Sequence, residues 1–266
     1  MPEYASRGDP RRSMFLLWGR IELGSRGPKQ GLDVADVARA GIALADAEGL
    51  GAVSMRRVAQ AVGRSTMSLY TYVPGKAELL DLMLDTVLGE RAREVPPPGD
   101  DWRGAVEASA QGAWAFYERH PWVLDIAGAR ALLGPRELDV YEAELRLFDG
   151  LGLTATEQTQ LVGALASFVR GAARALADVR DAERATGMSD DEWWTTRSPL
   201  LTELAGEDWA ERYPTLTRLE QERAFAQADR SPDDATPYLE YEERAVFEFG
   251  LARLLDGIEA FVADRA

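Results

Sequence analysis

Residues 54–73 read SMRRVAQAVGRSTMSLYTYV, which predicts two short helices joined by a tight turn. Ser54 stands just before the first helix, where its hydroxyl can accept a hydrogen bond from a free backbone N–H. Gly63 follows that helix, and a positive φ at this glycine lets the chain reverse. Apolar residues recur at helical spacing in the first helix, so one of its faces is buried: Met55, Val58, Ala59 and Val62.

The second helix of the pair presents hydroxyl groups on its outer face. Ser65 or Thr66 can cap it, while Leu69 and Val73 lie four residues apart and face inward. The outward residues include no acidic side chain that phosphate would repel: Ser65, Thr66, Ser68, Thr71 and Tyr72. A short helix of this kind can enter a DNA major groove, so the stretch predicts a helix-turn-helix.

The net charge of −15 argues against a nucleic-acid partner, but the charges are unevenly distributed. Residues 1–95 hold 13 Lys and Arg against 12 Asp and Glu, a net of +1, while residues 96–266 hold 17 against 33, a net of −16. Between Gly49 and Ala77 no residue is acidic and four are basic: Arg56, Arg57, Arg64 and Lys76. A local positive patch is what phosphate needs. The alternative is a chance local bias of the surface.

The composition is that of an ordinary globular protein, with 46% hydrophobic and 28% charged residues. The length of 266 residues suggests two domains, or one of unusual size. The absence of cysteine excludes disulfides, cysteine zinc sites and thiol nucleophiles, and it fits a cytoplasmic location. The chain has no run of about 18 apolar residues that would predict a membrane span, so we expect no membrane partner.

Residues 1–31 are rich in Arg, Gly, Ser and Pro and predict a mostly irregular basic arm. Its basic clusters are residues 11–12 and 26–29. Such an arm could follow a phosphate backbone or a minor groove. The alternative is a disordered tail. Within the arm, residues 13–23 are apolar enough to form a short helix that packs on another element.

Apolar periodicity and cap residues predict further helices. One begins after Asp33 and ends at Gly49, and another runs from about Lys76 to Arg93. The Pro-rich segment 96–99 then separates two domains. Beyond it, we expect helices over residues 102–119, 122–133, 136–151, 154–186 and 237–263. We also expect capping boxes at residues 154–157 and 189–192. In residues 196–234 no helix can be assigned.

Residues 32–88 resemble the DNA-binding domain of the tetracycline-repressor (TetR) family. The resemblance is carried by residues 43–49 (ALADAEG), 54–59 (SMRRVA), Gly63, 69–70 (LY), 72–73 (YV) and 76–80 (KAELL). Residues 16–19 and 26–29 also resemble the arm of many actinobacterial members. The resemblance implies an all-α homodimer whose subunits each have a helix-turn-helix head and a larger helical body. It divides the chain into a basic arm (1–31), a DNA-binding domain (32–94) and a ligand-binding and dimerisation domain (95–266).

By this resemblance, DNA contacts come from the helix-turn-helix and its flanks: Arg56, Ser65, Thr66, Met67, Ser68, Tyr70, Thr71, Tyr72 and Lys76. The chemistry agrees, because Arg56 and Lys76 can meet phosphate. Ser68 and Thr71 can form hydrogen bonds to base edges. For Tyr70, packing within the three-helix core is the alternative to a phosphate contact.

The resemblance also implies a homodimer that pairs through the helices beginning near residues 156 and 237 and binds a palindromic operator in double-stranded DNA. The alternative is that these helices form only the subunit's own core. The candidates for binding a small-molecule inducer, aromatic or hydrophobic, are Trp114, Tyr117, His120, Trp122, Phe168 and Arg170, with Trp193 and Trp194 beside them. Each of these could instead be plain core. One histidine and no cysteine leave no metal-ligand set, so we expect neither a metal nor a cofactor.

The sequence therefore predicts a one-component transcriptional regulator, a repressor that a small-molecule inducer releases from its operator. The alternative is an all-helical enzyme that carries a basic head. We expect no enzyme, because the sequence has no phosphate-binding glycine loop and no serine in a G-x-S-x-G nucleophile motif. It also has no residues at the spacing of metal ligands. A sequence-insensitive architectural protein conflicts with the net charge of −16 on residues 96–266.

Overall fold

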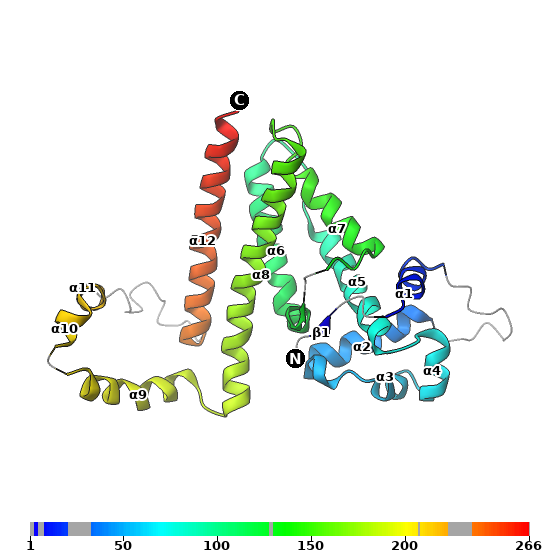
Figure 1. The fold of residues 1–266 in the computed structure, drawn as a ribbon, viewed down its shortest axis with the longest axis horizontal. Helices are drawn as coiled ribbons and strands as arrows, with labels where there is room; N and C mark the ends of the chain where they lie inside the picture. The colour runs from blue at the N-terminus through cyan, green and yellow to red at the C-terminus, as the bar shows by residue number, and fades with distance from the viewer. Residues whose placement is uncertain are drawn as a thin grey trace. The chain divides into compact units, whose positions relative to one another are not determined.

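The structure, a computed structural model, describes residues 3–4, 8–20, 33–127, 130–206, 208–222 and 236–265. These residues are almost entirely helical (Figure 1), which confirms the all-α prediction. The only strands among them are β1 (Glu3–Tyr4) and β2 (Ile126–Ala127), which pair in parallel. Contacts divide the chain into two compact units, residues 1–174 with 249–266 and residues 175–248.

The helices that the structure describes are α1 (Pro10–Leu17), α2 (Val34–Glu48), α3 (Met55–Ala61), α4 (Thr66–Tyr72), α5 (Lys76–Glu94), α6 (Trp102–Arg119), α7 (Pro135–Arg146), α8 (Ala155–Thr186), α9 (Asp190–Ala205), α10 (Trp209–Arg212), α11 (Pro214–Gln221) and α12 (Tyr238–Ala263). Two short 3-10 helices are also present, η1 (Leu50–Ala52) and η2 (Pro121–Asp125). None of these described helices combines the length and apolarity that crossing a bilayer requires.

Helices α3 and α4 form the predicted helix-turn-helix. The Ser54 hydroxyl accepts a hydrogen bond from the third N–H of α3, and the Ser65 hydroxyl accepts one from the third N–H of α4. Gly63 in the turn between them has a φ of +66°. Leu69 and Val73 are fully buried, as the spacing predicted. The local sequence therefore determined the start, the turn and the inner face of this motif.

Helix α2 completes a three-helix unit, because it packs on α3 while α3 packs on α4 (Figure 1). Asp33 caps α2 and forms a capping box with Asp36. The helix ends at Gly49, whose φ is +80°. Both limits match the prediction.

Helix α5 connects this unit to the rest of the first compact unit, since it contacts α1, α2, α6 and α7. Gly41 of α2 lets the two helices approach closely, because a Cβ at this position would lie 2.6 Å from Sδ of Met83. Asp85, near the middle of α5, accepts hydrogen bonds from the backbone N–H groups of Arg136 and Glu137. These are free N–H groups of the first turn of α7, so α5 supplies the cap that α7 lacks in its own sequence.

The predicted helix over residues 122–133 is wrong. Residues 121–125 form η2 and residues 126–127 form β2. The physical reason is a long-range contact: the guanidinium of Arg170 on α8 donates to the carbonyl oxygens of Val123, Leu124 and Ile126 at 3.5, 2.9 and 2.8 Å. Arg170 thus supplies hydrogen-bond donors to the carbonyls of a segment that is not α-helical.

Helix α7 ends at Arg146, earlier than the predicted residue 151. The side-chain amide of Gln158 donates to the Leu145 carbonyl at 2.7 Å and to the Asp149 carboxylate at 3.0 Å. Gly150 then takes a φ of +79°, which continues the turn toward α8. A side chain from the next helix thus helps to end α7.

The predicted helix in the N-terminal arm exists but begins earlier. Asp9 caps α1 and Pro10 is its first residue, so the helix covers residues 10–17 instead of 13–23. Leu16 and Leu17 are buried, and α1 packs on α5. The basic cluster 26–29 lies outside the described residues.

The second compact unit holds the later part of α8, helices α9 to α11 and the first part of α12. The predicted capping boxes are both present, at residues 154–157 before α8 and 189–192 before α9. Within this unit, Arg180 and Glu240 form an ion pair at 2.8 Å. Residues 196–234, where no helix was assigned, contain the end of α9 together with α10 and α11.

Replacing Gly63 with Ala should lower the free energy of unfolding by about 1 kcal/mol, because a left-handed conformation is unfavourable for a residue with a Cβ. Urea denaturation followed by circular dichroism measures the change. Gly51→Ala is the matched control, because Gly51 also has open space around its Cβ position and has no positive φ. Equal effects at the two glycines would contradict the role assigned to the turn.

Candidate nucleic-acid interface and ligand cavity

Leu69 and Val73 pack α4 onto the core, and the opposite face of α4 is exposed. Met67 is 79% exposed and Tyr70 is 43% exposed. The structure thus places Tyr70 outside the three-helix core, and Tyr72 is the tyrosine that packs partly against that core. The outer face of α4 offers hydroxyl, phenol and thioether groups.

The nine residues predicted to contact DNA lie on α3, α4 and the turns next to them. The exposed members are Arg56, Ser65, Met67, Tyr70 and Thr71, and the half-buried members are Thr66, Ser68, Tyr72 and Lys76. The structure brings them together on one motif. Their contacts with DNA stay a prediction.

The two neighbouring arginines of α3 differ in their surroundings. Arg57 forms a two-pronged ion pair with Glu48 at the end of α2, with distances of 2.9 and 2.5 Å. Hydrogen bonding from Arg57 lowers the pKa of Glu48 and keeps this carboxylate ionised. Among the described residues no carboxylate pairs with Arg56, whose side chain is exposed. The charge of Arg56 is therefore available for a phosphate.

A cavity of about 150 Å³ lies in the first compact unit, between α5, α6, α7 and α8. Its wall is mainly aliphatic and aromatic: Leu88, Arg91, Val106, Ser109, Ala110, Ala113, Phe116, Tyr117, Val140, Glu144, Leu147, Phe148, Val162, Leu165, Ala166 and Val169. Concave apolar sites with a few polar groups are the usual sites for small organic molecules.

The polar part of the wall is a buried ion pair. Nη2 of Arg91 lies 2.9 Å from Oε1 of Glu144, and it also donates to the carbonyl and the hydroxyl of Ser109 at 2.9 and 2.6 Å. Burial raises the pKa of Glu144, although the charge of Arg91 and its hydrogen bond act in the opposite direction. Neither residue of this pair was among the residues predicted to bind a ligand. A signal existed, because Arg91 continues the apolar stripe of α5, four residues after Val87.

Of the six residues predicted to bind a ligand, only Tyr117 lines this cavity. Trp114 is buried in α6 at 4% exposure. The Phe168 ring sits where a Cβ of Gly250 on α12 would lie, within 2.7 Å. Arg170 holds the carbonyls of residues 123–126 and lies 5.9 Å from the Tyr117 ring centre. Their binding to a ligand stays a prediction, and Trp193 and Trp194 belong to α9 in the second compact unit.

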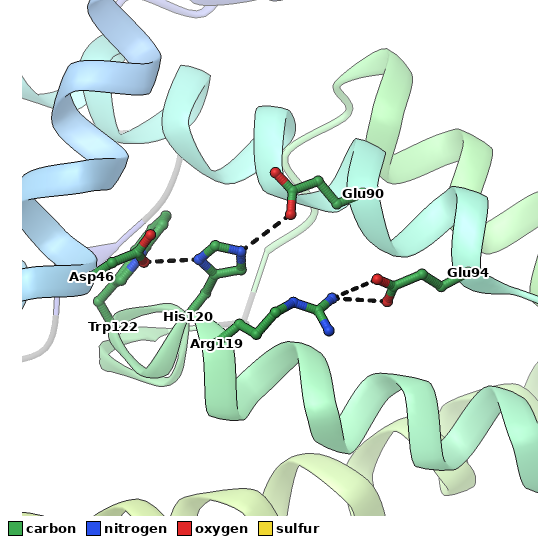
Figure 2. Close-up of polar contacts among 6 residues, drawn as sticks. All are labelled: Asp46, Glu90, Glu94, Arg119, His120 and Trp122. Carbon is green, nitrogen blue, oxygen red and sulfur yellow. Dashed lines mark hydrogen bonds and ion pairs between the residues drawn. The ribbon is translucent and has the colours of Figure 1, made fainter.

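The two remaining candidates, His120 and Trp122, lie where α6 meets α2 (Figure 2). Oδ1 of Asp46 on α2 accepts a hydrogen bond from the Trp122 indole at 2.7 Å and lies 2.8 Å from Nδ1 of His120. Nε2 of His120 lies 3.4 Å from a carboxylate oxygen of Glu90 on α5. Both ring nitrogens thus face carboxylates, and a protonated ring can donate to both.

We call Asp46, Glu90, His120 and Trp122 the junction cluster. It joins the end of α6 to α2 and α5, and His120 and Trp122 are buried. The Phe116 ring, which lines the cavity, lies 5.5 Å from the His120 ring in an edge-to-face arrangement. The junction cluster is therefore in direct contact with one wall residue of the cavity.

Comparison with known proteins decides what kind of molecule this is. The model of the family described as "Bacterial regulatory proteins, tetR family" matches residues 37–83, and that of "Tetracyclin repressor-like, C-terminal domain" matches residues 95–262. The chain belongs to the TetR family. As a member of this TetR family, it is a DNA-binding transcriptional regulator.

The TetR-family relatives include the HTH-type transcriptional repressor DrrR1 of Streptomyces coeruleorubidus, which is 42% identical over 265 residues, 99% of this chain and 90% of that protein. Among solved structures, the TetR-family protein ActR of Streptomyces coelicolor in complex with actinorhodin superimposes with a TM-score of 0.68 at 26% identity, covering 89% of this chain and all of that one. Apo ActR gives a TM-score of 0.65 at 26% identity, covering 88% of this chain and 98% of that one.

Replacing Asp46 with Ala should lower the free energy of unfolding by about 2–3 kcal/mol, because it leaves the buried Trp122 N–H and the His120 ring without their charged acceptor. Chemical denaturation followed by fluorescence measures the loss. The matched control is Glu94→Ala, which removes a carboxylate from the exposed pair with Arg119 (Figure 2) and should cost less than about 1 kcal/mol. A loss at Asp46 no larger than the control's would show that the junction cluster does not stabilise the fold.

Proposed function

We propose that the chain is a homodimeric repressor that binds a palindromic operator and that an aromatic or hydrophobic small molecule releases it. The observation that carries the proposal is the combination of an open, hydroxyl-lined α4 with an apolar cavity in the same compact unit. The relative DrrR1 is a transcriptional repressor, which supports repression rather than activation by this chain.

In this proposal, residues 32–94 are the DNA-binding head, residues 95–266 the ligand-binding and dimerisation domain, and residues 1–31 a basic arm. Arg56 and Lys76 meet phosphates, which set the position of the head. Ser68 and Thr71 form hydrogen bonds to base edges, and Met67 can touch a thymine methyl. Ser65, Thr66, Tyr70 and Tyr72 complete the interface.

Helices α8 and α12 are the proposed dimer contacts. Val246 and Phe249 on α12 are 58% and 65% exposed. Gly163 and Gly171 on α8 have open space where a Cβ would lie, which permits the close approach of another helix. Two-fold symmetry would present two copies of α4 to two half-sites of one operator.

The cavity is the proposed inducer site, with Tyr117 as the predicted ligand residue in its wall. The related ActR has a crystal structure in complex with actinorhodin, which supports a small-molecule ligand for this chain. Release requires that the inducer bind the DNA-free state more tightly than the DNA-bound state. Contact of the cavity wall with the junction cluster offers a route by which ligand binding can shift α2 and α5.

The test is footprinting of the purified chain on the DNA beside its own coding region, followed by titration with actinorhodin. We expect protection of an inverted repeat, a dimer by light scattering, and loss of protection as actinorhodin is added. A monomer at micromolar concentration would overturn the dimer, and protection without an inverted repeat would overturn the palindromic operator.

Replacing Arg56 with Ala should weaken binding to every DNA sequence by a similar factor and reduce the slope of log K against log salt by roughly 1, because one phosphate contact is lost. Fluorescence anisotropy at several salt concentrations measures both. Arg136→Ala is the control, since it removes an equal charge from an exposed ion pair on α7. A salt slope that falls equally in the two variants would mean that net charge, rather than a contact, sets the affinity.

A further inference from the structure

The outer face of α4 carries the most exposed methionine among the residues that the structure describes. Met67 is 79% exposed, and Met188, the next in exposure, is 37% exposed. Met14 is half-buried, while Met55 and Met83 are buried at 7% and 0% exposure. The thioether of Met67 is therefore the one that a small molecule dissolved in water reaches most readily.

Thioethers are the only sulfur groups in this chain, because the sequence contains no cysteine. Oxidants of the peroxide class convert an accessible methionine to methionine sulfoxide. In this reaction the O–O bond of hydrogen peroxide breaks, one oxygen atom bonds to the Met67 sulfur, and the other leaves as water with both protons. The sulfur loses two electrons and the peroxide gains them. A methionine sulfoxide reductase, supplied with a thiol reductant, reverses the change.

Oxidation would change the apolar group that α4 presents to DNA. In the proposed function Met67 touches a thymine methyl. A sulfoxide places a polar oxygen against that methyl, which offers no hydrogen bond, so the contact becomes unfavourable. The sulfoxide carries no charge, and the phosphate contacts proposed for Arg56 and Lys76 stay as they are.

We infer that Met67 is a reversible oxidation site, through which peroxide weakens sequence-specific binding of the chain to its operator. The inference rests on the proposed function, because it adds a second means of release at the same DNA-binding face. The exposed side chain of Met67 can take up an oxygen without disturbing the packing of the head. Met55 and Met83 belong to the hydrophobic core, so their oxidation would disrupt the fold instead.

The first measurement is the order in which the methionines are oxidised. The full-length chain is treated with hydrogen peroxide, and sulfoxide at each methionine is quantified by mass spectrometry of its peptides. We expect Met67 to react faster than Met188, and the operator duplex located by footprinting to slow the reaction at Met67 alone. Equal rates at Met67 and Met188 overturn the inference.

The second measurement is the affinity for the operator before and after peroxide treatment, by fluorescence anisotropy. Treatment should raise the dissociation constant of the wild type about 10-fold or more, since one wrong contact in a protein–DNA site costs roughly 5- to 150-fold. The slope of log K against log salt should not change, because no positive charge is removed. Methionine sulfoxide reductase with dithiothreitol should restore the starting affinity.

Met67→Leu cannot form a sulfoxide, so peroxide should not change its dissociation constant. Each protein is compared with itself before and after treatment, and any effect of the leucine on binding therefore cancels. Met188→Leu is the matched control, because Met188 is also exposed but belongs to the second compact unit. This variant should lose affinity as the wild type does. Circular dichroism verifies that the treated proteins are folded.

A wild type whose operator affinity is the same after Met67 is fully oxidised overturns the inference, and so does an equal loss of affinity in Met67→Leu. Both outcomes leave the proposed function intact, because the untreated chain still binds its operator. An untreated chain that protects no inverted repeat refutes the proposed function, and the inference falls with it.

Discussion

The packing of α5 in the centre of the first compact unit is the constraint on which the other elements depend. Leu79, Met83 and Val87 are fully buried, and each such side chain contributes about 1.5–3 kcal/mol by its removal from water. The same helix begins at Lys76, a proposed DNA contact, and reaches Arg91 in the cavity wall, which lies about 22 Å further along the helix axis. A stiff, buried helix thus connects the two sites, and neither end can tilt without disturbing the contacts with α2 and α7.

The sequence was sufficient for features that depend on neighbouring residues. Caps at Asp33, Ser54 and Ser65 act within three residues, and Gly63 acts through its own backbone, so the helix-turn-helix followed from local chemistry. The long helix α8 was predicted with its capping box because its apolar period extends over many turns. These signals need no knowledge of the tertiary structure.

Features fixed by distant side chains could not be predicted in the same way. Residues 122–133 are apolar enough for a helix, but residues 121–127 are not α-helical, and their carbonyls accept hydrogen bonds from Arg170, more than 40 positions away. His120 and Trp122 are aromatic and near the cavity in sequence, yet their polar atoms face Asp46 of α2. Composition identified them as candidates for a pocket, while the actual partner depends on how α2 and α6 pack. Arg91 and Glu144 were missed because the place of Arg91 on the apolar stripe of α5 indicates that it is buried but does not show which residue pairs with it.

The junction cluster has one practical consequence. His120 is the single histidine of the chain, and both of its ring nitrogens lie close to carboxylates from α2 and α5. The imidazole resonances of the unlabelled protein therefore come from this point alone. Proton NMR of the two carbon-bound protons of the His120 imidazole can therefore report changes where the DNA-binding helices meet the rest of the molecule. It needs neither mutation nor isotope labelling.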